Sequence, residues 1–77
     1  MVTNINNRLK NERLVINGQS YEYLPPINMK DLLLYLGFNP KVIVIDYNGR
    51  VLQKDFWSKT FLKPMDIIEI LTIAGGG

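Results

Sequence analysis

The chain has 77 residues, a formal net charge of +2, no cysteine and no histidine, and 47% of its residues are hydrophobic. This length suits one small domain, whose core must come from aliphatic and aromatic packing because no disulfide can support it. The composition excludes a thiol nucleophile and a histidine base. The nine basic residues are scattered without forming a stripe, which argues against a nucleic-acid partner.

No apolar stretch approaches the ~20 residues of a membrane span, so we expect no membrane partner. Residues 1–8 also lack the apolar core of a signal peptide. We therefore expect the protein to stay where it is made. That compartment is the cytoplasm, or the plastid stroma if the gene belongs to an organelle.

A β-hairpin is predicted after a polar start. Residues 1–12 are rich in asparagine and show no periodicity, so we expect a flexible N-terminal extension there. Strand-like runs at 13–16 and 20–24 flank Asn17-Gly18. This dipeptide is typical of type I′ turns, in which both central residues have positive φ. Two consecutive prolines end the second strand.

One short helix is predicted next. Asn28 suits the N-cap, and Asp31 lies in the first turn, where the helix dipole favours a negative charge. Gly37 favours a left-handed C-cap. Apolar residues at helical spacing form one face of this helix: Met29, Leu32, Leu33 and Leu36.

The second half of the chain predicts three more strands. Residues 41–47 are mostly apolar and β-branched, and Asn48-Gly49 turns the chain into a short strand at 51–52. A single helical turn is then expected to place Trp57 over the edge of the core. The last strand begins after a turn at 63–66.

This order of elements predicts the β-grasp, or ubiquitin-like, architecture. It is an α+β fold in which a mixed sheet of four to five strands packs on one helix. We expect residues 13–74 to form the domain, with the last strand inside the sheet. Residues 75–77 are expected to form a flexible glycine tail.

Alternation along the last strand separates two sets of apolar side chains. Ile68 and Ile70 are assigned to the core beneath the helix. The other face receives Ile67, Leu71 and Ile73. An exposed apolar patch often marks a partner site, so we predict that these three residues form a docking patch. Edge packing or a dimer contact is the alternative.

The other aromatic residues are expected to be structural. We expect the four tyrosines on the surfaces of strands and helix: Tyr21, Tyr23, Tyr35 and Tyr47. A platform for stacking nucleic-acid bases is not expected, because basic residues are not interleaved with them.

No catalytic constellation is visible. The seven acidic residues fall on turns, caps and strand ends, and the serines have no histidine to activate them. No glycine-rich loop joins a strand to a helix. We therefore expect no catalytic residue, no metal site and no bound cofactor. The distinctive group is the carboxylate of Gly77, which follows Gly75 and Gly76. A tail without side chains suits insertion into a partner's narrow active site, although a frayed terminus has the same appearance.

Several motifs together resemble a known family. They are Ile16-Asn17-Gly18, the segment Ile45 to Leu52 around Asn48-Gly49, Trp57 in an acidic-aromatic pair, and the ending Ala74-Gly75-Gly76-Gly77. The stretch from Leu14 to Gly77 carrying them is similar to ThiS, the sulfur carrier of thiamine biosynthesis. The chain departs from the family at two places. It has Met65-Asp66 where the family usually has Gly-Asp, and Gln53-Lys54 where the family often has Pro-Arg.

The resemblance implies a role for the tail. A ThiF-like adenylating enzyme would use ATP to adenylate Gly77, with Gly75 and Gly76 threaded into its active site. The adenylate would become a thiocarboxylate, which a ThiG-like thiazole synthase would use as its sulfur source. The free carrier would be a monomer.

Three alternatives remain open from the sequence. The sulfur carrier of molybdopterin synthase shares the fold and tail, but it commonly has prolines before the final glycines, where this chain has Thr72-Ile73-Ala74. A ubiquitin-type modifier is the second alternative. The third is a β-grasp interaction module without any reaction at its tail.

Overall fold

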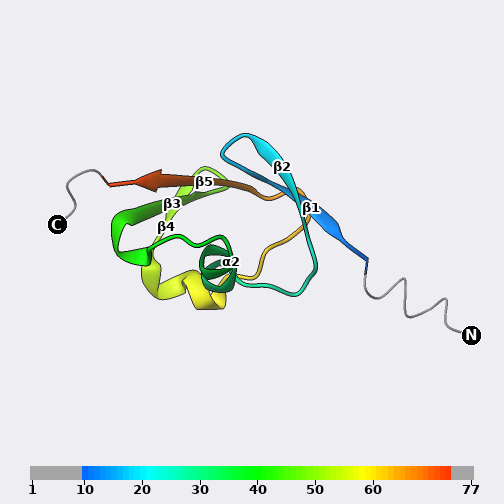
Figure 1. Ribbon diagram of the computed structural model, residues 1–77, viewed down its shortest axis with the longest axis horizontal. Coiled ribbons are helices and arrows are strands. Elements are labelled where there is room, and N and C mark those ends of the chain that lie inside the picture. The colour runs from blue at the N-terminus through cyan, green and yellow to red at the C-terminus, as the bar shows by residue number, and fades with distance from the viewer. Residues whose placement is uncertain (1–9, 74–77) are drawn as a thin grey trace, which may run out of the picture.

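A mixed five-stranded sheet packs against one α-helix (Figure 1). The computed structural model describes residues 10–73, so the predictions for residues 1–9 and 74–77 lie outside the described residues. The strands are β1 (Glu12–Ile16), β2 (Gln19–Tyr23), β3 (Ile43–Tyr47), β4 (Arg50–Leu52) and β5 (Ile67–Thr72). The helical segments are α2 (Met29–Tyr35) and two 3-10 helices, η1 (Pro40–Val42) and η2 (Lys54–Lys59).

The sheet has the strand order β2-β1-β5-β3-β4. Strands β1 and β2 form one antiparallel hairpin, and β3 and β4 form another. Strand β5 lies between them, parallel to β1 and antiparallel to β3. The β-grasp prediction is therefore confirmed, including the inner position of the last strand.

Both hairpin turns have the predicted conformation. Asn17 and Gly18 have φ of 50° and 81°, and Asn48 and Gly49 have φ of 52° and 89°. Asparagine and glycine adopt this left-handed region more readily than other residues, which explains why this dipeptide stands at both turns.

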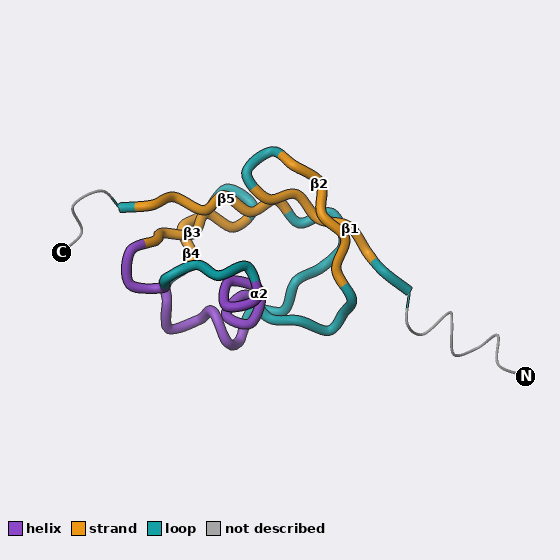
Figure 2. The backbone as a smooth tube through the Cα atoms, viewed as in Figure 1, coloured by secondary structure: helices purple, strands orange, loops and turns teal. Residues whose placement is uncertain are grey.

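The helical segments cover one side of the sheet, as Figure 2 shows by colour. Helix α2 begins at Asn28, whose Oδ1 accepts a hydrogen bond from the Asp31 N–H at 2.8 Å. The core on this side contains Met29, Leu32 and Leu33 of the predicted helix face, with Leu36 partly buried against them, and the inner face of β5. Its buried hydrophobic residues are Leu14, Ile16, Tyr23, Met29, Leu32, Leu33, Ile43, Ile45, Trp57, Leu62, Ile68 and Ile70.

Helix η2 places Trp57 against this core, as predicted. The indole is buried, and its Nε1–H donates to the Leu52 carbonyl oxygen at 3.0 Å. Satisfying this polar atom allows a large aromatic side chain to be buried without an energetic penalty for an unpaired donor.

Several local predictions differ from the structure. Strand β2 lies one residue earlier than expected at both ends, and β4 begins at Arg50 instead of residue 51. Strand β1 begins at Glu12, one residue earlier than expected. Strand β3 begins only at Ile43, because Asn39 caps η1 by accepting from the Lys41 N–H at 3.0 Å.

The surface positions predicted for Tyr23 and Tyr47 are wrong. Tyr47 is half-buried on the core face of β3 and packs against the core. The β1–β2 register places Tyr23 opposite Glu12, on the face that also carries Leu14, so its ring is buried.

In the described part of the chain, no helix is long and apolar enough to cross a membrane.

Candidate functional site

The described chain ends at Ile73, and in the sequence only Ala74 separates this residue from the glycine tail. Gly75, Gly76 and Gly77 lie outside the described residues, so the prediction that Gly77 reacts stays a prediction. The strand before the tail can be followed to Ile73, whose N–H donates to the Val42 carbonyl oxygen at 2.7 Å. The backbone is therefore held by hydrogen bonds up to the last described residue.

The two Asn-Gly turns hold β5 from both sides. The Asn17 N–H donates to the Ile68 carbonyl oxygen at 2.9 Å, and its Oδ1 accepts from the Ile70 N–H at 2.8 Å. Asn48 makes the same two kinds of bond to Ile67, donating from its N–H and accepting at Oδ1, both at 2.7 Å. The asparagine side chains thus extend the hydrogen-bond ladder beyond β1 and β3 and fix the position of β5.

A buried carboxylate fixes the start of β5. Asp66 is 6% exposed and accepts hydrogen bonds from the Tyr47 hydroxyl, from Asn48 Nδ2 at 3.1 Å and from the Lys63 N–H at 2.7 Å. Burial raises the pKa of the Tyr47 phenol, and the hydrogen bond and charge of Asp66 raise it further. At neutral pH the phenol therefore remains a protonated donor to the carboxylate.

The sequence predicts only a turn at Asp66, and this role as a buried acceptor was not predicted. The alternation that assigns Ile68 and Ile70 to the core places Asp66 on the same face. A carboxylate on a core face needs several donors. Tyr47, Asn48 and the turn at Lys63 provide them.

The face of the sheet opposite the helix carries the predicted docking patch. Ile67, Leu71 and Ile73 are 53%, 54% and 43% exposed, whereas Ile68 and Ile70 are buried. This face is called the open face below. It also carries Val44 of β3, opposite Leu71, and Val51 of β4. The predicted division of β5 into two faces is confirmed, and the docking role of the patch stays a prediction.

Two acidic residues interrupt this apolar surface. Asp46 of β3 lies directly opposite Glu69 of β5, and Val51 lies opposite Asp46 on the other side. Asp46 accepts a hydrogen bond at Oδ1 from the Gly49 N–H at 2.9 Å. Among residues 10–73, neither carboxylate forms an ion pair.

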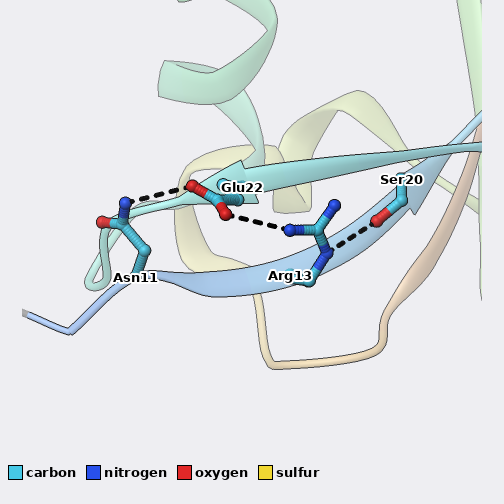
Figure 3. A network of polar contacts seen from close by, with 4 residues as sticks. All are labelled: Asn11, Arg13, Ser20 and Glu22. Atoms are coloured by element: carbon cyan, nitrogen blue, oxygen red, sulfur yellow. Dashed lines mark hydrogen bonds and ion pairs between the residues drawn. The ribbon is translucent and has the colours of Figure 1, made fainter.

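A different arrangement surrounds the acidic residue of β2 (Figure 3). Glu22 Oε2 pairs with Arg13 Nη1 at 2.9 Å, and Arg13 Nε also donates to Ser20 Oγ at 2.9 Å. Asn11 Nδ2 donates to the other carboxylate oxygen of Glu22 at 3.3 Å. The charge of Glu22 is thus compensated within the chain, unlike the charges of Asp46 and Glu69.

Residues 10–73 contain no group of three or more acidic side chains that could hold a metal ion. A cleft of about 360 Å³ lies between the β1–β2 hairpin and α2, lined mainly by apolar and tyrosine side chains. One of these is Tyr23, whose phenol pKa is raised by burial and then by the charges of Asp66 and Glu12. A protonated phenol in an apolar cleft supplies neither a base nor a nucleophile at neutral pH.

Comparison with known proteins agrees with this arrangement. The family model described as the ThiS family matches residues 14–77. The chain belongs to the ThiS family. Among curated relatives, the uncharacterized protein ycf40 of Trieres chinensis is 45% identical over 62 residues, covering 80% of this chain and 85% of the relative. The ycf40 protein of Porphyra purpurea is 37% identical over 68 residues, covering 88% of this chain and 96% of the relative.

Solved ThiS structures share the fold. The crystal structure of the thiamine biosynthesis protein ThiS from Geobacter metallireducens superposes with a TM-score of 0.74 at 28% identity, covering 84% of this chain and 99% of that one. An NMR solution structure of a thiamine biosynthesis protein from the same organism gives a TM-score of 0.69 at 28% identity, covering 84% of this chain and 87% of that one.

The turn before β5 has Met65 at the position where the resemblance implies a glycine. Met65 has φ of 71° there. A residue with a Cβ is strained there, whereas glycine is not. The Met65 side chain is 76% exposed, so little packing offsets the strain.

Proposed function

We propose that this chain is a sulfur carrier whose Gly77 carboxylate is adenylated and converted to a thiocarboxylate, which donates sulfur for thiazole formation in thiamine biosynthesis. The observation that carries the proposal is the position of β5. This strand lies inside the sheet, and the backbone is hydrogen-bonded as far as Ile73. The sequence then ends with the three glycines of a ThiS-family ending. A fixed strand gives the tail a defined starting point, and glycines let it enter a narrow site.

The proposed chemistry requires no catalytic residue from the chain. A carboxylate oxygen of Gly77 attacks the α-phosphorus of ATP, and pyrophosphate leaves. An enzyme persulfide then attacks the acyl carbon, and AMP leaves. A second enzyme thiol then attacks the cysteine sulfur that had carried the persulfide, and the sulfur–sulfur bond breaks. These two enzyme sulfurs form a disulfide, and the outer sulfur stays on the acyl carbon as the thiocarboxylate. The chain is therefore a co-substrate that uses no bound cofactor, and the activating enzyme uses the ATP.

We propose two partners for this cycle. A ThiF-like enzyme performs the adenylation, and a ThiG-like thiazole synthase accepts the sulfur. Both must take in Gly75, Gly76 and Gly77, so both are expected to approach the end of β5. Leu71 and Ile73 are exposed apolar residues there, and Ile67 extends the same surface back to the start of β5. We assign these residues to docking, with the free carrier as a monomer.

The proposed compartment follows from the relatives. The ycf designation is used for plastid genes, which favours the plastid stroma over the cytoplasm. Fractionation of cells from the source organism, followed by immunoblotting for the chain, tests this assignment.

The decisive experiment uses the purified chain and the adenylating enzyme of the same organism. The native chain is expected to support ATP–pyrophosphate exchange, and deletion of Gly77 is expected to abolish it. Mass spectrometry of the chain isolated from its host should show replacement of one oxygen by sulfur. Normal exchange by the deletion variant would refute the role of Gly77. Sulfur transfer to a molybdopterin synthase large subunit, but not to a thiazole synthase, would refute the assigned pathway.

A further inference from the structure

Asp46 and Glu69 form a pair of like charges at the centre of the open face. They are register partners in the antiparallel β3–β5 ladder, so their side chains emerge on the same face with Cβ atoms about 4.5–5.5 Å apart. Like charges placed directly opposite each other destabilise a sheet. Asp46 Oδ1 accepts from the Gly49 N–H in the β3–β4 turn, but an uncharged amide oxygen could accept that bond equally, so the fold does not require the like-charge contact.

The apolar side chains around the pair increase the energetic benefit of a compensating cation when a partner covers this surface. Ile67 and Leu71 precede and follow Glu69 on the same face of β5, and Val44 and Val51 lie beside Asp46. When a partner covers these apolar side chains, it also removes water from the two carboxylates. Carboxylates that lose water without gaining a counter-charge are strongly destabilised.

The charges on the same sheet show that the pair is not compensated locally. Arg13 is bound to Glu22 and Ser20 at the β1–β2 edge (Figure 3), which leaves its guanidinium group committed there. Within the described range, no lysine or arginine lies within ion-pair distance of Asp46 or Glu69. The two carboxylates are therefore available to a positive charge from outside this part of the chain.

We propose, building on the sulfur-carrier function, that Asp46 and Glu69 together bind an arginine side chain of the adenylating enzyme at the centre of the docking surface. A guanidinium group presents a planar fork of N–H donors, which matches carboxylate oxygens better than the single ammonium of lysine. Its planar surface also packs against apolar neighbours such as Leu71 and Val44. The partner surface is therefore apolar with a central arginine.

Neutral isosteric variants test this assignment. Glu69→Gln and Asp46→Asn remove one charge each, and the amide oxygen that Asp46→Asn introduces can still accept the hydrogen bond from the Gly49 N–H. Asp55→Asn is the matched control, because Asp55 is an exposed acid on η2, on the helix side of the sheet. In ATP–pyrophosphate exchange, each open-face variant is expected to raise the KM for the carrier about tenfold, with kcat unchanged. The control is expected to match the native chain.

Two further measurements separate recognition from folding. Urea unfolding should show that Glu69→Gln and Asp46→Asn are at least as stable as the native chain, because each removes a like-charge contact. Raising the ionic strength should increase the KM of the native chain more than that of either variant. A loss of stability that parallels the rise in KM would instead indicate a structural role and overturn the proposal.

The remaining outcomes are also decisive. If both open-face variants behave like Asp55→Asn while the native chain is active, docking does not use the acidic pair. Calcium chloride alone is titrated into the native chain by calorimetry. Binding that Glu69→Gln abolishes would identify a cation site rather than an arginine site. Failure of the native chain to support exchange would refute the sulfur-carrier function and, with it, this proposal.

Discussion

At the scale of single residues, the backbone conformation of Met65 lowers the free energy of unfolding. Its φ of 71° is strained for any residue with a Cβ, and its side chain is largely exposed. Met65→Gly should therefore stabilise the protein by about 0.5–1 kcal/mol, after the greater freedom of glycine in the unfolded chain is subtracted. Urea unfolding measures the difference.

Met65→Ala is the control for this change. It removes the same exposed side chain but keeps the Cβ, so its stability should stay within about 0.5 kcal/mol of the native value. Equal stabilities of the glycine and alanine variants would show that the turn is not strained.

The Tyr47 hydroxyl is the second residue with a specific energetic role. Tyr47→Phe removes one of the three donors to buried Asp66, which should cost about 1.5–3 kcal/mol at neutral pH. Because the folded-state pKa of this phenol is raised above its ordinary value of 10.0, its contribution is fully present below pH 10. The stability difference between native and variant should shrink as the pH rises above 10. A difference that stays constant up to pH 11 would contradict this role.

At the scale of elements, the two Asn-Gly turns act as clamps on β5 as well as turns. Asn17→Asp keeps an acceptor for the Ile70 N–H and should cost less than about 1 kcal/mol. Asn48→Asp instead places a carboxylate where Nδ2 now donates to Asp66 Oδ1, and should cost at least about 2 kcal/mol more. Urea unfolding at pH 7 measures both changes.

The pH dependence separates this repulsion from a simple loss of a hydrogen bond. Repulsion between residue 48 and Asp66 should raise carboxyl pKa values in the folded variant, so its destabilisation should decrease as the pH falls. Asn48→Gly keeps the positive φ but removes the side chain, and it should show no such recovery. Similar losses of stability for Asn17→Asp and Asn48→Asp would show that repulsion by Asp66 does not add to the cost of Asn48→Asp.

The local elements could be predicted because their signals are local. The Asn-Gly dipeptides, the Asn28 cap and the alternation of Ile67 to Leu71 each act over a few residues. The clamps could not be predicted, because Asn17 and Ile70 meet only after the parallel β1–β5 pairing forms. The same reason hides the acidic pair, since the sequence does not specify which β3 residue faces Glu69.

At the scale of the whole molecule, the sheet separates the core from the surface proposed for docking. Its covered side contains the core, and its open face carries exposed apolar residues around an acidic pair. Adjacent residues of β5 serve the two sides, because successive side chains point in opposite directions. Under the proposed docking role, the open face would contact a partner without any rearrangement of the core.

A pair of neighbouring truncations tests this separation. Ile70 is 6% exposed, so Ile70→Ala should cost about 2–5 kcal/mol of folding free energy. Leu71 is 54% exposed, so Leu71→Ala should cost less than about 1 kcal/mol. Leu71→Ala should nevertheless weaken binding to both the adenylating enzyme and the thiazole synthase, measured by calorimetry at a temperature where each variant is folded.

The two variants control for each other, because they remove similar aliphatic side chains from adjacent positions. Folded Ile70→Ala should bind both partners nearly normally, since its side chain lies beneath the sheet. If Leu71→Ala is the less stable variant, the two faces do not divide the roles in this way. If Leu71→Ala binds both partners with native affinity, the docking surface lies elsewhere. Weakened binding to only one partner would mean that the two enzymes use different parts of the open face, with the glycine tail as their shared element.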